Sequence, residues 1–289
     1  MNNDLWAPKR RIEASFLRAL NKIARRIIRI VKDCKGDFDA MQNSLLEFAR
    51  TRLFHKLCRA AAMKMVTGLF ADQGRTWRQA AAIHGQGRII YEALKKELVG
   101  DTGKTVNRLV EENAALIRTL PRDIADEVAR YVSRETFKGR RASELEDEIQ
   151  RRFPTYTRAR AKLIARTQVS MTQTDLIRAR CEKFGRRWYV WRPIGGSQGD
   201  GRTRKSHRGM SGVICAWTDP PAPETLFPEK NKDGRPRRST LGHYHPGQCP
   251  NCRCYPEPII NLDIYEWPMK VYRHNKIQRM SKRAFESIM

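Results

Sequence analysis

The sequence changes character at Gly185, and this change limits the folds that the chain can adopt. Before Gly185, apolar residues recur every three or four positions, which is the period of amphipathic α-helices. After it, glycine and proline are frequent, and residues 188–191 are aromatic and β-branched, as is typical of a strand. The sequence therefore predicts an α+β protein with a mostly helical N-terminal half and a small, loop-rich C-terminal module containing a few short β-strands.

Local signals for helix ends divide the helical part into several elements. Asp37 is placed to cap a helix, Pro121 suits the first turn of another, and Gly185 suits a helix C-terminus. Ser143 begins a match to a capping box, and Pro154 is expected to end the helix that starts there. The predicted helices cover residues 9–32, several segments within 37–118, and residues 119–138, 143–153 and 155–184.

Three further elements are expected in the C-terminal part. Residues 220–240 are rich in proline and basic residues and predict a long exposed loop. Residues 259–262 are apolar and predict one more strand. The tail from residue 268 repeats the basic amphipathic pattern of residues 9–32 and predicts a basic helix.

The charge of the chain indicates a polyanionic partner. Lysine and arginine number 57 against 31 acidic residues, which gives a formal net charge of +26. Such an excess destabilises a compact state by self-repulsion unless a polyanion neutralises it. The basic amphipathic residues 9–32 could alternatively lie on an anionic membrane, but no apolar run approaches a signal peptide or the roughly 18–20 residues of a membrane helix. Because the basic residues continue along the whole chain, nucleic acid is the favoured partner.

Residues 151–187 carry eleven lysines and arginines against two acidic residues, which on a helix form a basic ridge. No base-reading motif accompanies them, so contact with DNA is expected at the phosphates and without sequence preference. The candidate nucleic-acid-binding residues are Arg151, Arg152, Arg158, Arg160, Lys162, Arg166, Arg202, Arg204, Lys205 and Arg208.

The seven cysteines separate into two groups. An odd number of cysteines without a secretory signal argues against a disulfide framework and for a reducing compartment. Four of them are scattered as small residues expected to be buried. The other three, Cys249, Cys252 and Cys254, are clustered near the histidines at positions 207, 243 and 245.

This cluster predicts a structural zinc site. Thiolate and imidazole are the preferred ligands of zinc, and a loop-rich module with little apolar content gains stability from a metal. The spacing of Cys249 and Cys252 is that of a zinc knuckle. The alternative is that the thiols are reduced residues of a small core and that the histidines bind backbone groups.

The segment from Asp200 to His207 allows a second chemistry. In a metal-dependent nuclease, His207 would be the base, Asp200 a metal ligand and Arg202 the phosphate clamp. No second acidic pair lies nearby, although two-metal nucleases need one. The favoured interpretation is structural: Asp200 pairs with a neighbouring arginine, Thr203 caps a turn, and His207 completes a metal site. The chain is therefore expected not to be an enzyme.

The order of these motifs resembles the Mu F-like phage head-morphogenesis family. The resemblance covers about residues 115–258. It is carried by Leu163-Ile-Ala-Arg-Thr-Gln168 on a helix, Trp191, Asp200-x-Arg-Thr-Arg-x-x-His207, Gly212, and His245-Pro followed by Cys252-Arg-Cys254. The ligand-capable residues shared with the family are His207, His245, Cys252 and Cys254, with Cys249 as a substitute ligand.

The resemblance implies a minor head protein of a tailed bacteriophage. Such a protein would be made in the host cytoplasm, enter the virion at the capsid interior or portal vertex, and contact the portal, other capsid proteins and packaged DNA. It would act in head morphogenesis or genome ejection. The resemblance assigns residues 119–262 to a head-morphogenesis domain (helices 119–184, β/loop module 186–262). Outside it, the residue patterns predict a basic N-terminal helix in residues 1–36, a helical region in 37–118 and a basic tail in 263–289.

Overall fold

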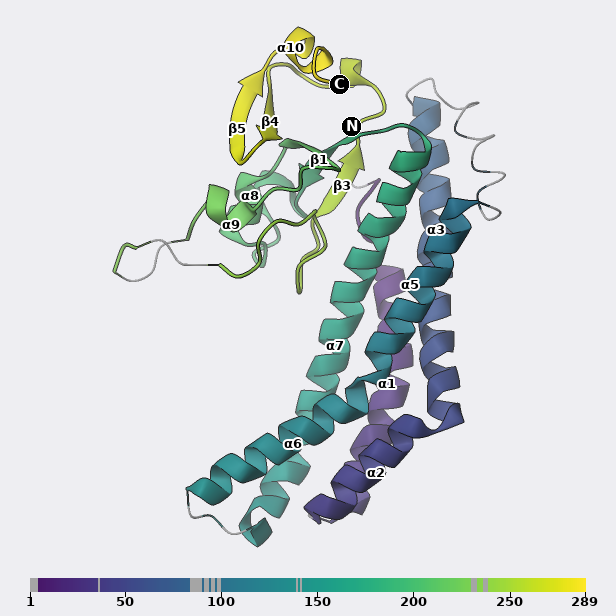
Figure 1. Ribbon diagram of the computed structural model, residues 1–289, viewed down its shortest axis with the longest axis vertical. Helices are drawn as coiled ribbons and strands as arrows, with labels where there is room; N and C mark the ends of the chain where they lie inside the picture. Colours follow the sequence, from purple (N-terminus) through teal and green to yellow (C-terminus); the bar gives the residue numbers. More distant parts are fainter. Residues whose placement is uncertain are drawn as a thin grey trace. The chain divides into compact units, whose positions relative to one another are not determined.

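The structure is a computed structural model, and it describes the chain except residues 1–4, 36, 84–89, 91–93, 95–96, 98–99, 139, 141, 230–232 and 236–238. The chain forms two compact units. The helical unit contains Arg10–Gly68 and Asn107–Gln168, and the sheet unit contains Met1–Lys9, Leu69–Val106 and Val169–Met289. The expected α+β class is confirmed, with the strands confined to the C-terminal part (Figure 1).

The helical unit is built on amphipathic helices whose apolar faces pack together. Helix α1 (Arg10–Asp33) buries the predicted face that includes Phe16, Leu20 and Ile27. Helix α2 (Phe38–Arg50) packs against α6 (Leu120–Phe137). Helices α3 (Arg52–Ile83), α5 (Asp101–Arg118) and α7 (Ala142–Lys183) each contribute residues to both units. Two predicted helix starts are confirmed. The Asp37 carboxylate accepts a hydrogen bond from the Ala40 amide at 2.9 Å, and Pro121 lies in the first turn of α6.

The predicted break at Pro154 is wrong, because α7 continues through this residue from Ala142 to Lys183. Proline removes one hydrogen bond from a helix interior, but both Pro154 and its neighbour Phe153 are buried. The fully buried Thr157 hydroxyl donates to the Phe153 carbonyl at 2.7 Å. Tertiary burial on both sides of the proline therefore outweighs its local preference. Ser143 lies within the first turn of α7 rather than before it.

The sheet unit contains a five-stranded sheet in the order β3-β1-β2-β4-β5. Strand β1 (Trp188–Arg192), the predicted strand, pairs antiparallel with β2 (Ile214–Ala216) and β3 (Tyr255–Pro258). Strand β2 pairs parallel with β4 (Met269–Arg273), which forms an antiparallel hairpin with β5 (Lys276–Met280). Short helices α8 (Lys205–Gly209), α9 (Pro223–Leu226) and α10 (Lys282–Glu286) and two 3-10 turns (Gly196–Gln198, Leu262–Ile264) complete the unit.

Two predictions for this part are wrong. The strand expected at residues 259–262 lies earlier, at Tyr255–Pro258, where it pairs with β1. The tail from residue 268 forms the β4–β5 hairpin instead of a basic helix. His274 and Asn275 connect these strands with φ angles of 46° and 64°, the positive values that a two-residue hairpin turn requires. Within the loop expected at 220–240, the structure describes the single helical turn α9.

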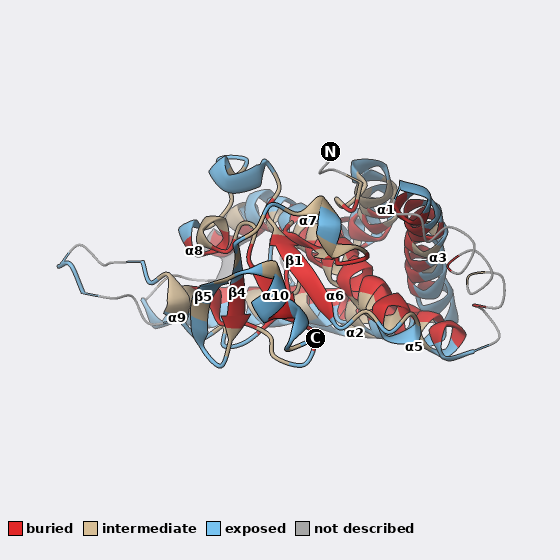
Figure 2. Cartoon of the chain, turned by 90° about the horizontal axis from the view of Figure 1, so that it is seen from above, coloured by how far each residue is buried: buried red, intermediate tan, exposed pale blue. Residues whose placement is uncertain are grey.

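The side chains of β1 alternate between two buried clusters, and this alternation positions the site. Trp188 and Val190 pack on one face with Ile214 and Phe285. Tyr189 and Trp191 pack on the other face, together with the three clustered cysteines. Strand β1 is buried along its length (Figure 2). None of the helices that the structure describes is both long enough and apolar enough to cross a bilayer.

Candidate metal centre

Two short segments bring the predicted ligands together in the sheet unit. His207 lies on helix α8, and the cysteines lie in the loop that leads into β3. This loop is held against α7 by the Thr174 hydroxyl, which donates to the Pro246 carbonyl at 2.6 Å. Gly247 has a φ of +88°, and a Cβ at this position would lie 2.8 Å from the Thr174 hydroxyl oxygen. Glycine therefore lets the loop turn closely against the helix just before Cys249.

The imidazole of His207 faces two thiols through its Nδ1 atom. Nδ1 lies 3.4 Å from the Sγ of Cys252 and 3.4 Å from the Sγ of Cys254. The three ligand atoms lie within 4.8 Å of one another, and all three residues are buried. In a tetrahedral zinc site the bond lengths place sulfur and nitrogen ligands about 3.5 Å apart. The spacing of these three residues therefore fits a zinc ion.

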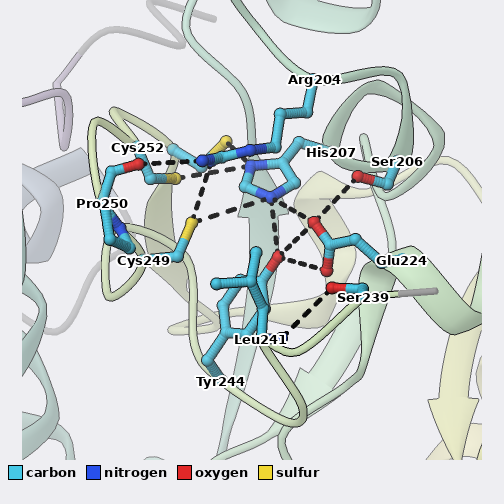
Figure 3. A network of polar contacts seen from close by, with 11 residues as sticks. Arg204, Ser206, His207, Glu224, Ser239, Leu241, Tyr244, Cys249, Pro250 and Cys252 are labelled. Atoms are coloured by element: carbon cyan, nitrogen blue, oxygen red, sulfur yellow. Dashed lines mark hydrogen bonds and ion pairs between the residues drawn. The ribbon is translucent and has the colours of Figure 1, made fainter. Parts of the chain in front are cut away.

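The other nitrogen of the ring meets a carboxylate and a tyrosine (Figure 3). Nε2 of His207 lies 2.8 Å from the Tyr244 hydroxyl oxygen and 3.4 Å from Oε1 of Glu224. The Tyr244 hydroxyl itself lies within 2.8 Å of both Glu224 carboxylate oxygens, to which it donates. Nε2 thus keeps its proton toward Tyr244 and Glu224, and Nδ1 is the nitrogen that could bind a metal on the side of the thiols. A carboxylate that orients a histidine in this way is a regular feature around metal ligands.

Nothing in the sequence pointed to Glu224 and Tyr244. Glu224 lies on α9, within a segment predicted to be an exposed loop, and Tyr244 precedes His245 without belonging to any motif. Only the fold brings them to His207. No sequence pattern distinguishes Glu224 from the other acidic residues of the C-terminal module.

The charges of this cluster are set by burial and by these contacts. Burial lowers the pKa of His207, but hydrogen bonds to Cys249, Cys252 and Glu224 outweigh it and raise the pKa to about 11. Burial raises the pKa of Glu224, but hydrogen bonds from His207 and Tyr244 bring it to about 2. Without a metal, the two groups therefore form an imidazolium–carboxylate pair. A metal at Nδ1 would displace a proton from that atom.

Cys249 lies at the edge of the three-residue cluster. Its Sγ is 3.9 Å from Nε2 of His207 and accepts a hydrogen bond from the Arg204 guanidinium at 3.1 Å. Arg204 also donates to the Pro250 carbonyl at 3.0 Å. A hydrogen bond with Cys252, followed by burial, raises the pKa of the Cys249 thiol. Cys249 is thus adjacent to the cluster and linked to one of its members.

His245, predicted as a ligand, lies outside the cluster. Its Nδ1 accepts a hydrogen bond from the Tyr189 hydroxyl at 2.9 Å, and its ring packs at 5.0 Å from that of Trp217. Burial lowers the pKa of His245 to about 4, with a smaller contribution from Arg178. His243 is exposed, and its Nδ1 faces the Pro220 carbonyl at 2.8 Å. The structure therefore brings together His207, Cys252 and Cys254, places Cys249 beside them, and directs His245 to Tyr189.

Residues 123–256 match the family model described as Phage Mu protein F like protein. The chain carries a Mu F-like region. The resemblance predicted from the sequence is confirmed, and the matched residues include the whole His/Cys cluster.

The chain also resembles an uncharacterized protein of Haemophilus influenzae (strain ATCC 51907 / DSM 11121 / KW20 / Rd). The two are 30% identical over 156 residues, which are 54% of this chain and 30% of the relative. The chain thus corresponds to less than a third of that relative's length. No solved structure matches the chain.

Within the Mu F-like region, the Asp200 motif forms a turn. The Asp200 carboxylate accepts hydrogen bonds from the Arg202 amide at 3.1 Å and the Thr203 hydroxyl at 2.9 Å. These contacts are those of an Asx-type turn leading into α8, where His207 lies. Of the two arginines predicted to pair with Asp200, Arg202 is exposed and contacts Asp200 through its backbone amide, and Arg204 donates hydrogen bonds to Cys249 and Pro250.

The basic residues of the Mu F-like region differ in what they contact. On α7, Arg160 pairs with Asp123 at 3.0 Å, and Arg166 lies 3.8 Å from Glu13. Arg152 stacks over the ring of Tyr131, with its guanidinium carbon 4.8 Å from the ring centroid. Arg208 donates to the Gln198 carbonyl, and Arg204 holds Cys249. The members with exposed side chains are Arg151, Arg152, Arg158, Lys162, Arg202 and Lys205.

Proposed function

We propose that the chain is a minor head protein of a tailed bacteriophage, associated with the portal and with packaged DNA. The observation that carries this proposal is the family match over residues 123–256, which includes the buried His/Cys cluster. The net charge of +26 supports a position against DNA. In this role the protein acts in head morphogenesis or genome ejection, and it resides in the virion after assembly in the host cytoplasm.

We infer that the His/Cys cluster is a structural zinc centre. His207 would bind through Nδ1 and Cys252 and Cys254 through their sulfur atoms, because these three atoms have the spacing of zinc ligands. Cys249 is the proposed fourth ligand, since it is hydrogen bonded to Cys252. Its Sγ faces Nε2 of His207 in this structure, so its side chain would have to turn toward the Nδ1 side to bind the ion. Bound zinc would cross-link α8 to the loop before β3. Glu224 and Tyr244 would keep the imidazole in the required orientation.

A structural role suits this cluster better than a nuclease role. His207 is only 1% exposed, and both of its ring nitrogens face protein groups. A general base must reach the proton that it removes. A buried imidazole with both nitrogens engaged does not meet that condition, and Asp200 is occupied within its own turn. We therefore propose that the chain is not an enzyme.

For DNA, the proposed contacts are the exposed basic residues on α7 and around α8. Arg151, Arg158 and Lys162 are exposed on α7, and Arg202 and Lys205 are exposed near α8. Side chains of this kind bind phosphates, so binding should be independent of sequence and should weaken steeply with salt. The same residues could serve a nonspecific DNA-binding protein outside any virion, which is the alternative function.

Two measurements test the proposal. Cryo-electron microscopy of assembled particles should find the protein in few copies at the portal vertex. Its absence from particles would favour the nonspecific DNA-binding alternative, and a distribution over the whole shell would contradict the portal assignment.

Elemental analysis of the purified protein should give one zinc per chain. Cys252→Ser and Cys254→Ser should each reduce the zinc content, whereas Cys34→Ser, a half-buried thiol in the helical unit, should not. Plasmid incubated with the protein and a divalent metal tests the nuclease alternative. Nicking that is lost in His207→Ala would overturn the structural interpretation.

A further inference from the structure

The outer side of helix α1 carries a continuous row of positive charge. Five exposed side chains follow one another along it at spacings of three or four residues: Arg18, Lys22, Arg25, Arg29 and Lys32. This spacing places the five residues, called the α1 row, on one face of the helix. At about 1.5 Å per residue, the row extends over about 21 Å.

The charges of the α1 row are not neutralised within the chain. In the part of the protein that the structure describes, no carboxylate forms an ion pair with any of the five residues. The two acidic residues of α1 are Glu13, which lies 3.8 Å from Arg166 of α7, and Asp33, which ends the helix. On α7, by contrast, Arg160 is paired with Asp123. The α1 row therefore keeps its full charge for an outside partner.

The packing of α1 argues against a membrane as this partner. A basic amphipathic helix binds a bilayer by burying its apolar face at the boundary between headgroups and acyl chains. The apolar face of α1, which includes Phe16, Leu20 and Ile27, is already buried within the protein. None of the large apolar side chains of α1 is exposed. The helix therefore has no apolar surface left to insert into lipid.

The composition of the exposed face favours DNA over a protein partner. Apart from Ala14 and Asp33, every exposed residue of α1 is an arginine or a lysine. Stable protein interfaces are centred on aromatic or apolar anchors, and the face offers none. Duplex DNA presents one phosphate charge per roughly 1.7 Å of its axis, so about twelve phosphates lie along a row of this length. The α1 row therefore matches the dense, regular charge of a DNA backbone.

We propose that the α1 row is a second DNA-binding surface of this chain, in addition to the exposed basic residues on α7 and around α8. The inference rests on the proposed contact with packaged DNA, and it places part of that contact outside the matched residues 123–256. Each phosphate that the row neutralises releases a counterion. The five side chains should therefore contribute about 4–5 to the slope of log affinity against log salt.

Fluorescence anisotropy of the full chain with a short labelled DNA duplex, measured over a series of salt concentrations, tests this proposal. The row variant carries Arg18→Gln, Lys22→Gln, Arg25→Gln and Arg29→Gln. Its slope of log affinity against log salt should be smaller than that of the wild type by about 3–4. Circular dichroism should show unchanged helix content, because the four side chains are exposed and glutamine is a good helix former.

The matched control removes the same amount of charge from the sheet unit. It carries four substitutions at exposed positions: Lys270→Gln, Lys276→Gln, Arg279→Gln and Arg283→Gln. Because these residues lie outside both proposed surfaces, the slope should change by less than about 1. The comparison separates contact at the α1 row from a general effect of net charge.

Lysine acetylation of the wild-type chain, followed by mass spectrometry, supplies a direct readout. Duplex DNA should slow the acetylation of Lys22 and Lys32 and leave that of Lys270 and Lys276 unchanged. A row variant with the wild-type slope, or acetylation of Lys22 and Lys32 that DNA does not affect, would overturn the inference and leave the proposed α7 contacts in place. A wild type that does not bind duplex DNA would overturn the proposed contact with DNA as well. Weaker binding of the row variant to vesicles of anionic phospholipid, with unchanged affinity for DNA, would assign the row to a membrane instead.

Discussion

His245 offers a sharp test of which histidine belongs to the metal centre. Its imidazole is 3% exposed, and its Nδ1 accepts a hydrogen bond from Tyr189. Asparagine can place its side-chain oxygen close to the position of Nδ1 and so keep the bond from Tyr189. His245→Asn therefore removes the titrating group while preserving its main polar contact.

The structure gives the size of the expected effect. Burial lowers the pKa of His245 from 6.5 to about 4. The unfolded chain then binds a proton at this residue that the folded chain does not, so stability falls as the pH drops below 6.5 and levels off below about 4. Between pH 7 and pH 4.5 this difference costs the wild type about 2 kcal/mol of unfolding free energy, to an order of magnitude. The asparagine variant should not show this loss.

Urea unfolding of both proteins at pH 7 and pH 4.5 measures the difference directly. A chelator present throughout keeps the metal content equal. With a urea dependence of about 2 kcal/mol per molar, the wild-type midpoint should fall by about 1 M more than that of His245→Asn. His243→Asn is the matched control, because His243 is an exposed histidine two residues away in the same loop. Equal losses in the wild type and His245→Asn would refute the argument. In protein purified without chelator, a lower zinc content of His245→Asn than of the wild type at pH 7 would make His245 a ligand.

Three further predictions follow from contacts in the structure. Glu224→Gln should weaken zinc binding about 10- to 100-fold in a competition titration with a chromogenic chelator, because the carboxylate orients His207; unchanged affinity would contradict that role. Pro154→Ala should restore a hydrogen bond inside α7 and also remove the packing of the proline ring. The net effect should be an increase of about 1 kcal/mol in the free energy of unfolding, whereas a lower melting temperature would show that the lost packing is the larger effect. Replacing Arg151, Arg158 and Lys162 together by alanine should reduce the slope of log affinity for DNA against log salt by about 2–3; an unchanged slope would place the DNA on another surface.

Periodicity predicted the helices of this chain well, because their apolar faces pack within the chain. The stripe that includes Phe16, Leu20 and Ile27 is buried as its spacing required. The prediction failed at Pro154, where a local preference competed with burial on both sides of the residue. It failed again in the tail, where a positive φ at His274 and Asn275 produces a hairpin that the spacing of apolar residues alone does not reveal.

Only part of the proposed metal centre could be predicted from the sequence, because cysteine spacing and histidine position carry different amounts of information. Cysteine spacing favoured the pair Cys249 and Cys252, whereas the structure places Cys252 and Cys254 at Nδ1 of His207 and Cys249 beside them. The positions of the histidines in the sequence did not indicate which of them faces the thiols. His207 and His245 are both buried and both hydrogen bonded to a tyrosine, yet only His207 has a nitrogen facing the thiols. The difference arises from a carboxylate on α9, which holds Nε2 of His207 and so turns Nδ1 toward Cys252 and Cys254. Which histidine can bind a metal therefore depends on the groups around each ring. For His207 this group is Glu224 on α9, and for His245 it is Tyr189 on β1, and both come into contact with the histidines only in the folded protein.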